Sequence, residues 1–213
     1  MIDRRSILSS LFGLALAAVL VQPRFAAAND LEARGEKFIN GLAHEAIESL
    51  TKPDTPREER IKRFRKMFDD KFAVRSIGKF VLGRYWERAT DQERAEYLVL
   101  FEDLMVVSYV DRFQRYAGEN LHITQSRAEN GATVSVFTDI VRPNTGKPVQ
   151  VIWRIGVGKE TMKILDVMVE GTSLSQTLRS DFGSIISQRN GQVAGLIHEL
   201  RLKTAELKLP AKN

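Results

Sequence analysis

Residues 149–157 have the sequence VQVIWRIGV, and this stretch decides the fold. Its odd-numbered positions are all apolar, and the polar residues Gln150 and Arg154 stand between them. This two-residue alternation is typical of a β-strand that buries one face and exposes the other to water. The stretch therefore predicts a strand over residues 149–157 at the surface of an apolar core.

Three further segments, 121–128, 133–141 and 162–169, have the composition of strands. The connections between the four segments are short and carry hairpin signals, namely Asn130-Gly131, residues 144–147 (NTGK) and residues 158–160 (GKE). Short connections join antiparallel neighbours. We therefore expect a curved, four-stranded antiparallel meander.

Helical patterns lie on both sides of the predicted sheet, over residues 30–50, 55–72, 74–82, 91–116, 173–189 and 193–207. Three of these segments begin with a capping-box pattern, in which a hydroxyl residue is followed three positions later by Glu or Gln; the pairs are Thr55 with Glu58, Thr90 with Glu93, and Ser173 with Gln176. Helices, then strands, then helices indicate an α+β fold with helices packed against one sheet face.

The predicted helix over 91–116 is apolar around most of its circumference between Tyr97 and Val110. Such a helix is buried on most sides. Two interpretations follow: a central core helix, or a helix that faces a core on one side and an apolar ligand on the other. Periodicity alone favours the core, and composition does not decide between them.

The N-terminal residues have the pattern of an export signal. Arg4-Arg5 precede an uncharged apolar run from Ile7 to Val21, and small residues follow at 26–28. The run is shorter than the roughly twenty residues of a membrane span, which argues against the alternative of an anchor. We expect a cleavable signal over 1–28 and one soluble domain over 29–213. The paired arginines leave the route, general secretory or twin-arginine, open.

Composition excludes several classes of function. The 213 residues hold 32 basic and 27 acidic side chains, and removal of residues 1–28 leaves 29 and 26, a net charge of +3. This mild, interspersed surplus argues against nucleic-acid binding, although weak attraction to anionic membranes stays open. The chain has no cysteine, which removes disulfides, thiol nucleophiles and thiolate metal sites.

Catalytic and metal-binding motifs are missing from the sequence. The histidines, His44, His122 and His198, form no metal motif, and we expect them at the surface or its boundary. Asp166 and Glu170 share one face of the last predicted strand, so a catalytic acid–base pair is conceivable there. We favour a structural role instead, in which they bind the turn into the next helix or pair with Arg154 or Arg179. We expect no enzyme activity, metal or cofactor.

Two blocks of sequence resemble the toluene-tolerance family. The first is VLGRYW at residues 81–86, followed by Ala89-Thr90, Glu93, Tyr97, Phe101, Leu104, Tyr109 and Tyr116. The second is Gly146-Lys147-Pro148-Val149, Trp153-Arg154, Lys163, Asp166-Val167, Val169-Glu170-Gly171, Ser173-Leu174 and Arg179. Met162 and Thr172 depart from the family pattern. Together the blocks cover nearly all of residues 29–213.

The resemblance implies a periplasmic phospholipid carrier like that of the Mla (maintenance of outer-membrane lipid asymmetry) pathway. It implies a cavity for acyl chains with the head group largely outside. It also implies two partners, an inner-membrane ABC transporter complex with a lipid-binding substrate domain and an outer-membrane lipoprotein–porin complex. A hopanoid or another amphiphile as ligand, an enzyme with a hydrophobic pocket, and a structural adaptor remain alternatives.

A cavity for acyl chains would be lined by the inward residues of the sheet and of the long helix, because two acyl chains must be hidden from water. Strand faces are assigned by alternation, so a one-residue shift inverts an assignment. The candidate lipid-binding residues are Phe101, Leu104, Met105, Tyr109, Val134, Val136, Val149, Val151, Trp153, Leu165, Val167 and Val169.

Overall fold

A computed structural model of the chain describes residues 23–116, 118–143, 146–158 and 161–208. In chain order its elements are α1 (Pro23–Leu50), α2 (Arg57–Lys71), α3 (Val74–Leu82), the short 3-10 helix η1 (Gly83–Tyr85), α4 (Asp91–Gln114), β1 (Asn120–Asn130), β2 (Thr133–Val141), β3 (Val149–Val157), β4 (Met162–Val169), β5 (Thr172–Ser173), α5 (Leu174–Gln188) and α6 (Val193–Lys208). The α+β class is therefore confirmed.

Most of the predicted export signal, residues 1–22, lies outside the described residues. Its last part, residues 23–28, is the start of α1. Within the described ranges no helix is both long enough and apolar enough to cross a membrane. The signal and the division at residue 29 stay predictions.

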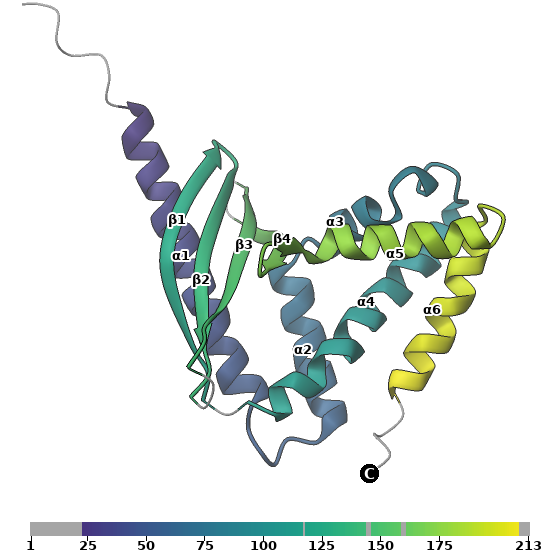
Figure 1. Ribbon diagram of the computed structural model, residues 1–213, viewed down its shortest axis with the longest axis horizontal. Coiled ribbons are helices and arrows are strands. Elements are labelled where there is room, and N and C mark those ends of the chain that lie inside the picture. The colour runs from purple at the N-terminus through teal and green to yellow at the C-terminus, as the bar shows by residue number, and fades with distance from the viewer. Residues whose placement is uncertain (1–22, 117, 144–145, 159–160, 209–213) are drawn as a thin grey trace, which may run out of the picture.

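The strands form one curved antiparallel sheet in the order β1-β2-β3-β4-β5, which confirms the meander (Figure 1). The sheet has five strands and not the four that were predicted. The additional strand, β5, is only two residues long, and Thr172 and Ser173 pair with the end of β4. Two residues are too few to produce a visible alternation, so this strand left no signal in the sequence.

A β-bulge interrupts the pairing of β3 with β4. Arg154 pairs with Asp166, but the next residue, Ile155, pairs with Ile164, so Leu165 has no partner. A bulge reverses the alternation of faces along its strand. Ile164 is therefore fully buried on the core side, whereas Leu165 lies on the opposite face, packed over Gly156.

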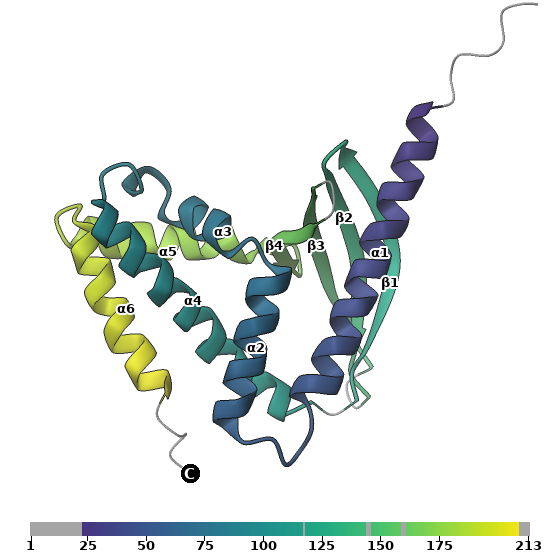
Figure 2. The ribbon, with the colours of Figure 1, turned by 180° about the vertical axis from the view of Figure 1, so that it is seen from behind.

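Helix α1 lies along β1 and β2 (Figure 2). Gly35 makes the close approach possible, because a Cβ at this position would lie 2.9 Å from Cγ1 of Val134. Glu32 accepts a hydrogen bond from the backbone N–H of Ala128, and Glu36 accepts one from the hydroxyl of Ser126. The helix thus covers the end of the sheet and satisfies donors of its edge strand.

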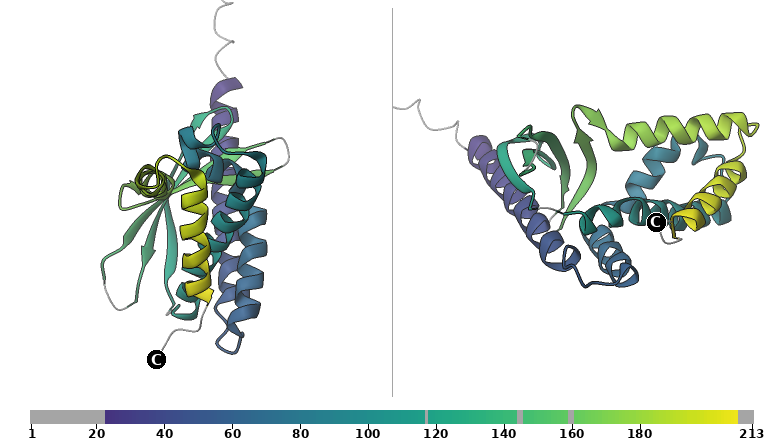
Figure 3. Two further views of the ribbon diagram at one scale, coloured as in Figure 1. Left: turned by 90° about the vertical axis from the view of Figure 1, so that its right-hand side faces the viewer. Right: turned by 60° about the horizontal axis from the view of Figure 1, so that its bottom comes forward.

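The apolar residues form two clusters, and α4 belongs to both. Phe101 and Leu104 pack with α3, α5 and α6, whereas Val106 and Val110 pack with α1, α2 and the sheet. Figure 3 shows α1, α2 and α4 on one side of the sheet, with α5 and α6 extending away from it. This double contact explains why α4 is apolar around most of its circumference.

Capping accounts for two of the three predicted helix starts. At α4 the N–H of Glu93 donates to Thr90 Oγ1 (3.2 Å) and the N–H of Thr90 donates to Glu93 Oε2 (2.8 Å). At α5 the N–H of Gln176 donates to Ser173 Oγ (3.1 Å). The box at Thr55 was wrong, since α2 begins at Arg57 without a side-chain cap. The carbonyl of Thr55 instead accepts a hydrogen bond from the buried Arg60 guanidinium.

Candidate functional site

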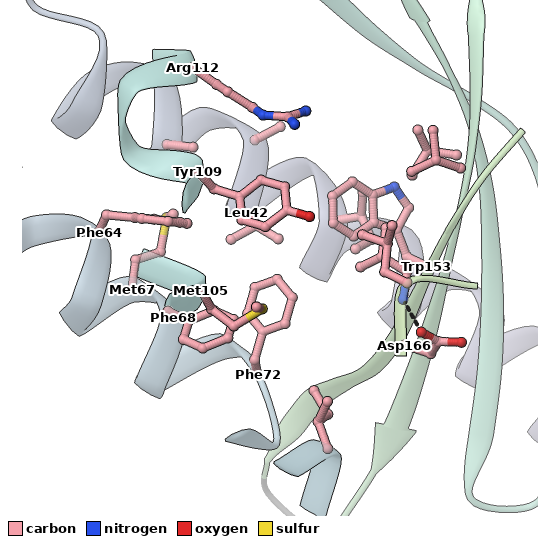
Figure 4. Close-up of a pocket in the computed structure, with 18 of the residues that line it drawn as sticks. Leu42, Phe64, Met67, Phe68, Phe72, Met105, Tyr109, Arg112, Trp153 and Asp166 are labelled. Atoms are coloured by element: carbon pink, nitrogen blue, oxygen red, sulfur yellow. Dashed lines mark hydrogen bonds between the residues drawn. The ribbon is translucent and has the colours of Figure 1, made fainter. Parts of the chain in front are cut away.

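A cavity of about 410 Å³ lies between the sheet and helices α1, α2, α4 and α5 (Figure 4). Its volume falls within the range of roughly 300–1,000 Å³ that is typical of ligand pockets. The walls are almost entirely aliphatic and aromatic side chains. Such a surface offers a ligand burial and dispersion contacts, and few hydrogen bonds.

Helix α2 contributes an aromatic stripe to the wall. Phe64 and Phe68 lie one turn apart on α2, and Phe72 follows at the same spacing just after the helix ends. Their neighbouring ring centroids are 6.2 Å and 4.7 Å apart. Residues four positions apart share one helix face, so the sequence itself aligns the three rings. The candidate residues were chosen from the predicted strands and the long helix over 91–116, so they do not include this stripe. The four-residue spacing of its rings is nevertheless visible in the sequence.

Helix α4 lines the cavity through Phe101, Met105 and Tyr109, which were predicted as candidates. These residues follow the same four-residue spacing. One turn further, the exposed guanidinium of Arg112 lies 4.8 Å from the centre of the Tyr109 ring. Figure 4 shows Arg112 at the edge of the cavity, beyond Tyr109. A cation therefore stands where the apolar wall meets solvent.

The sheet contributes the candidates Val151, Trp153, Val167 and Val169. Trp153 carries the only polar atom among them outside the backbone, and Nε1 donates to Thr138 Oγ1 at 3.0 Å. The indole is thereby held by the neighbouring strand.

Five candidates do not line the cavity. Leu104 packs in the cluster with α5 and α6, and Val134 and Val136 lie beneath α1. Leu165 lies on the other sheet face because of the bulge. Val149, the first residue of β3, is half-buried. Val134, Val136 and Val149 share the sheet face of the lining residue Trp153, but they lie at other positions along that face.

Helix α1 supplies a wall that the sequence argument did not anticipate, through Ile39, Leu42, Ala43 and Ala46. These positions repeat at three- and four-residue spacing. The amphipathic helix over 30–50 was predicted from the spacing of Phe38, Leu42, Ile47 and Leu50, and that spacing did not indicate which element the apolar face would meet. The apolar face of α1 was therefore predictable, but its position against the cavity was not.

Asp166 is the acidic residue of the cavity wall. Its Oδ1 accepts hydrogen bonds from the N–H groups of Val167 (2.9 Å) and Ser175 (3.2 Å), and Oδ2 accepts one from the Ser173 hydroxyl (2.6 Å). The other member of the pair, Glu170, accepts a hydrogen bond from the N–H of Gln150. These contacts agree with the structural interpretation, in which the carboxylate stabilises the turn into α5.

Metal-ligating side chains do not gather in the described part of the chain, where no three His, Asp or Glu residues are placed to hold an ion. The three histidines are exposed, as predicted, and His44 pairs with Glu48 at 3.2 Å. Within the same residues every buried side-chain nitrogen and oxygen has a hydrogen-bond partner. The arrangement is thus suited to binding an apolar group.

Comparisons with known proteins agree with this geometry. A family model described as "MlaC protein" matches residues 40–202. Among solved structures, a phospholipid-binding protein from Ralstonia solanacearum, determined in complex with a phospholipid at 1.53 Å, superposes with a TM-score of 0.73. The two sequences are 20% identical, and the match covers 81% of this chain and 98% of the other. This likeness shows a common fold.

Proposed function

Because this chain belongs to the MlaC protein family, we propose that it is a periplasmic carrier that encloses the acyl chains of a phospholipid in the cavity between the sheet and α1, α2 and α4. The match over residues 40–202 confirms the resemblance to the toluene-tolerance family. The solved relative from Ralstonia solanacearum has the same fold and holds a phospholipid, which supports the proposal.

The apolar cavity is the observation that carries the proposal. Burial of each methylene contributes about 0.8 kcal/mol, so a long acyl chain cannot be carried through water unless an apolar surface encloses it. Aromatic rings from α2 and α4 face aliphatic residues of the sheet across this space. The walls offer the contacts that an acyl chain needs.

Arg112 sets the orientation of the ligand. Its guanidinium stands at the exposed edge of the cavity, and a phosphate there would gain a charge-assisted hydrogen bond. The tails then point inward, toward Phe68 and Met105, and the head group stays at the surface. This cation favours a phosphate-bearing lipid over a hopanoid without an anionic group.

The carrier would accept and release its lipid at two membrane complexes, an inner-membrane ABC transporter complex with a lipid-binding substrate domain and an outer-membrane lipoprotein–porin complex. This part of the proposal rests on family membership and on the predicted export signal. An enzyme with a hydrophobic pocket would need a free acid or base in the cavity. Both carboxylate oxygens of Asp166 already accept hydrogen bonds, so this residue is not a free acid or base, which argues against that alternative.

A cavity-blocking substitution tests the proposal. Ala43 lines the cavity, so Ala43→Trp fills the space with an indole, whereas Ala95→Trp adds the same group to an exposed position of α4. The assay follows a fluorescently labelled phospholipid from vesicles to the protein. We expect transfer to the wild type and to Ala95→Trp, and little transfer to Ala43→Trp. Equal transfer to both variants, with both folded, would place the acyl chains elsewhere.

A further inference from the structure

A second, polar groove of about 540 Å³ lies between η1 and α5 and shares no lining residue with the apolar cavity. Its walls include Arg84 and Tyr85 of η1 and three serines of α5. The contacts described above for the apolar cavity do not involve this groove. A groove with this lining is suited to an oxyanion, because hydroxyl and guanidinium groups are hydrogen-bond donors.

Arg179 of α5 is placed at the groove by its neighbours. Its Nη1 donates to the carbonyl of Phe80 at 2.9 Å, and its guanidinium lies 4.8 Å from the centre of the Phe80 ring. The guanidinium also crosses directly over Gly83, where a Cβ would lie 3.0 Å from Cζ of Arg179. Gly83 has φ +58°, so glycine satisfies both the backbone conformation and the close approach.

The arginines at the groove are not neutralised. Among the described residues no carboxylate forms an ion pair with Arg84, Arg88 or Arg179. Arg84 donates to the hydroxyl of Tyr85 at 3.0 Å, and within the described residues its guanidinium forms no other hydrogen bond. A pair of unpaired guanidinium groups beside hydroxyl donors matches the several acceptor oxygens of a phosphate.

Positive charge is concentrated around the groove. Residues 74–89 hold four basic side chains, Arg75, Lys79, Arg84 and Arg88, and one acidic side chain, Glu87, a net charge of +3. The whole of residues 29–213 carries the same net charge. Arg179 adds a further charge from α5, which packs on α3 (Figure 1). We call Arg75, Lys79, Arg84, Arg88 and Arg179 the basic patch.

An exposed aromatic residue stands within the basic patch. Phe80 keeps 39% of its surface exposed on α3, beside Lys79 and beneath Arg179. Exposed aromatic rings flanked by basic side chains are typical of protein surfaces that meet the membrane interface. The combination favours a lipid surface over an acidic protein segment as the occupant.

We propose that the groove between η1 and α5 binds the phosphate of an anionic phospholipid head group, and that the basic patch thereby seats the protein on an anionic membrane surface. This site is separate from the apolar cavity that holds the acyl chains in the proposed function. It gives the carrier a contact with the bilayer from which a lipid arrives or to which it departs.

Vesicle sedimentation tests the proposal with the full exported protein. Vesicles of phosphatidylcholine are compared with vesicles of phosphatidylcholine and phosphatidylglycerol. We expect binding to the anionic vesicles, weakened by salt, and little to the neutral ones. The double variant Arg84→Gln/Arg179→Gln should bind about thirtyfold more weakly, from about 1 kcal/mol for each basic residue at the surface.

The matched control is Lys52→Gln/Lys62→Gln, which removes the same charge from two exposed positions outside the groove, one in the connection before α2 and one within α2. It should weaken binding by less than about threefold. Equal weakening by both double variants would show that only net charge matters, and would overturn the proposal. The phospholipid cargo extracted from the groove variant should match that of the wild type, so this test is independent of the apolar cavity.

A second variant covers the case in which the arginine variant does not fold. Ser184→Glu places a carboxylate in the groove from an exposed position of α5, and it should also abolish binding to anionic vesicles.

Two further outcomes would overturn the proposal. One is a rise of Tm with inorganic phosphate while anionic vesicles retain no protein, which identifies a free anion. The other is binding to native membranes that protease treatment removes, with none to lipid vesicles, which identifies an acidic protein.

Discussion

Trp153 of β3 donates a hydrogen bond from Nε1 to Oγ1 of Thr138 on β2, at 3.0 Å, and the Thr138 hydroxyl donates in turn to the carbonyl of Val151, also at 3.0 Å. Thr138 is almost completely buried. One hydroxyl therefore serves as acceptor for the indole and as donor to the sheet. This relay fixes a large aromatic side chain in the cavity wall and satisfies its polar atom.

Replacement of Thr138 tests the relay. Thr138→Val leaves the Trp153 N–H without its acceptor, and we expect it to lower the free energy of unfolding by about 1–3 kcal/mol. Thr138→Ser keeps the hydroxyl and should lose less. Urea unfolding followed by circular dichroism measures the difference. A larger loss in Thr138→Ser than in Thr138→Val would show that the methyl packing, and not the hydroxyl, holds the ring.

Arg112 should affect lipid affinity and not lipid capacity. Arg112→Gln removes the cation at the cavity edge, so we expect labelled phospholipid to bind about three- to fivefold more weakly, as an exposed ion pair contributes up to about 1 kcal/mol. The amount bound at saturation should not change. Arg115→Gln, which removes an exposed charge outside the cavity, is the control. Equal affinities of the two variants for labelled phospholipid would show that Arg112 does not contact the head group.

Asp166 should stabilise α5 without any part in chemistry. Asp166→Asn removes the charge that accepts two hydrogen bonds at the start of this helix and one from the N–H of Val167, and we expect it to cost about 1–3 kcal/mol of stability. Below its melting transition the variant should still accept lipid from vesicles. A variant with wild-type stability that no longer accepts lipid would contradict the structural role.

Acid should weaken the contact between α2, α4 and α6. Burial raises the pKa of the Asp103 carboxyl, but hydrogen bonds from Lys208 and Arg65 outweigh it and hold the pKa below its ordinary value. A lowered folded pKa gives stability that is present above the unfolded pKa of about 3.9 and is lost as the pH falls through the lower folded value. The contact thus contributes at neutral pH.

Asp103→Asn measures this contribution. The wild type should be more stable than the variant by a constant amount above about pH 5, and the difference should shrink below about pH 4. Asp54→Asn, at an exposed position, serves as the control for the removal of one carboxylate. A difference between wild type and Asp103→Asn that stays constant down to pH 2 would mean that the charge of Asp103 does not stabilise the fold.

Strands were predictable from the sequence because each element carried its own local signal. Strands 133–141, 149–157 and 162–169 begin and end where alternation and turn residues place them. The face of Leu165 was not predictable, because the bulge that reverses it depends on the pairing of Ile155 with Ile164. A register shift depends on the pairing of two strands, so it cannot be recognised from the sequence of a single strand.

The candidate site was predictable where an element faces the cavity along its whole length. Phe101, Met105 and Tyr109 repeat on one face of α4, so periodicity selected them. Val134 was assigned to the cavity because alternation gives the face of a strand, but not the part of that face that α1 covers. The stripe at Phe64 and Phe68 has the spacing of an amphipathic helix, and only the tertiary packing distinguishes a cavity wall from a core.

Native mass spectrometry of the protein purified from cells tests the central claim most directly. If the cavity carries a phospholipid, the spectrum should contain a species heavier than the polypeptide by the mass of one phospholipid, and collisional activation should release that lipid. Ala43→Trp should show the bare polypeptide. Bare wild-type protein, even after incubation with phospholipid vesicles, or a bound mass without phosphate, would contradict the account.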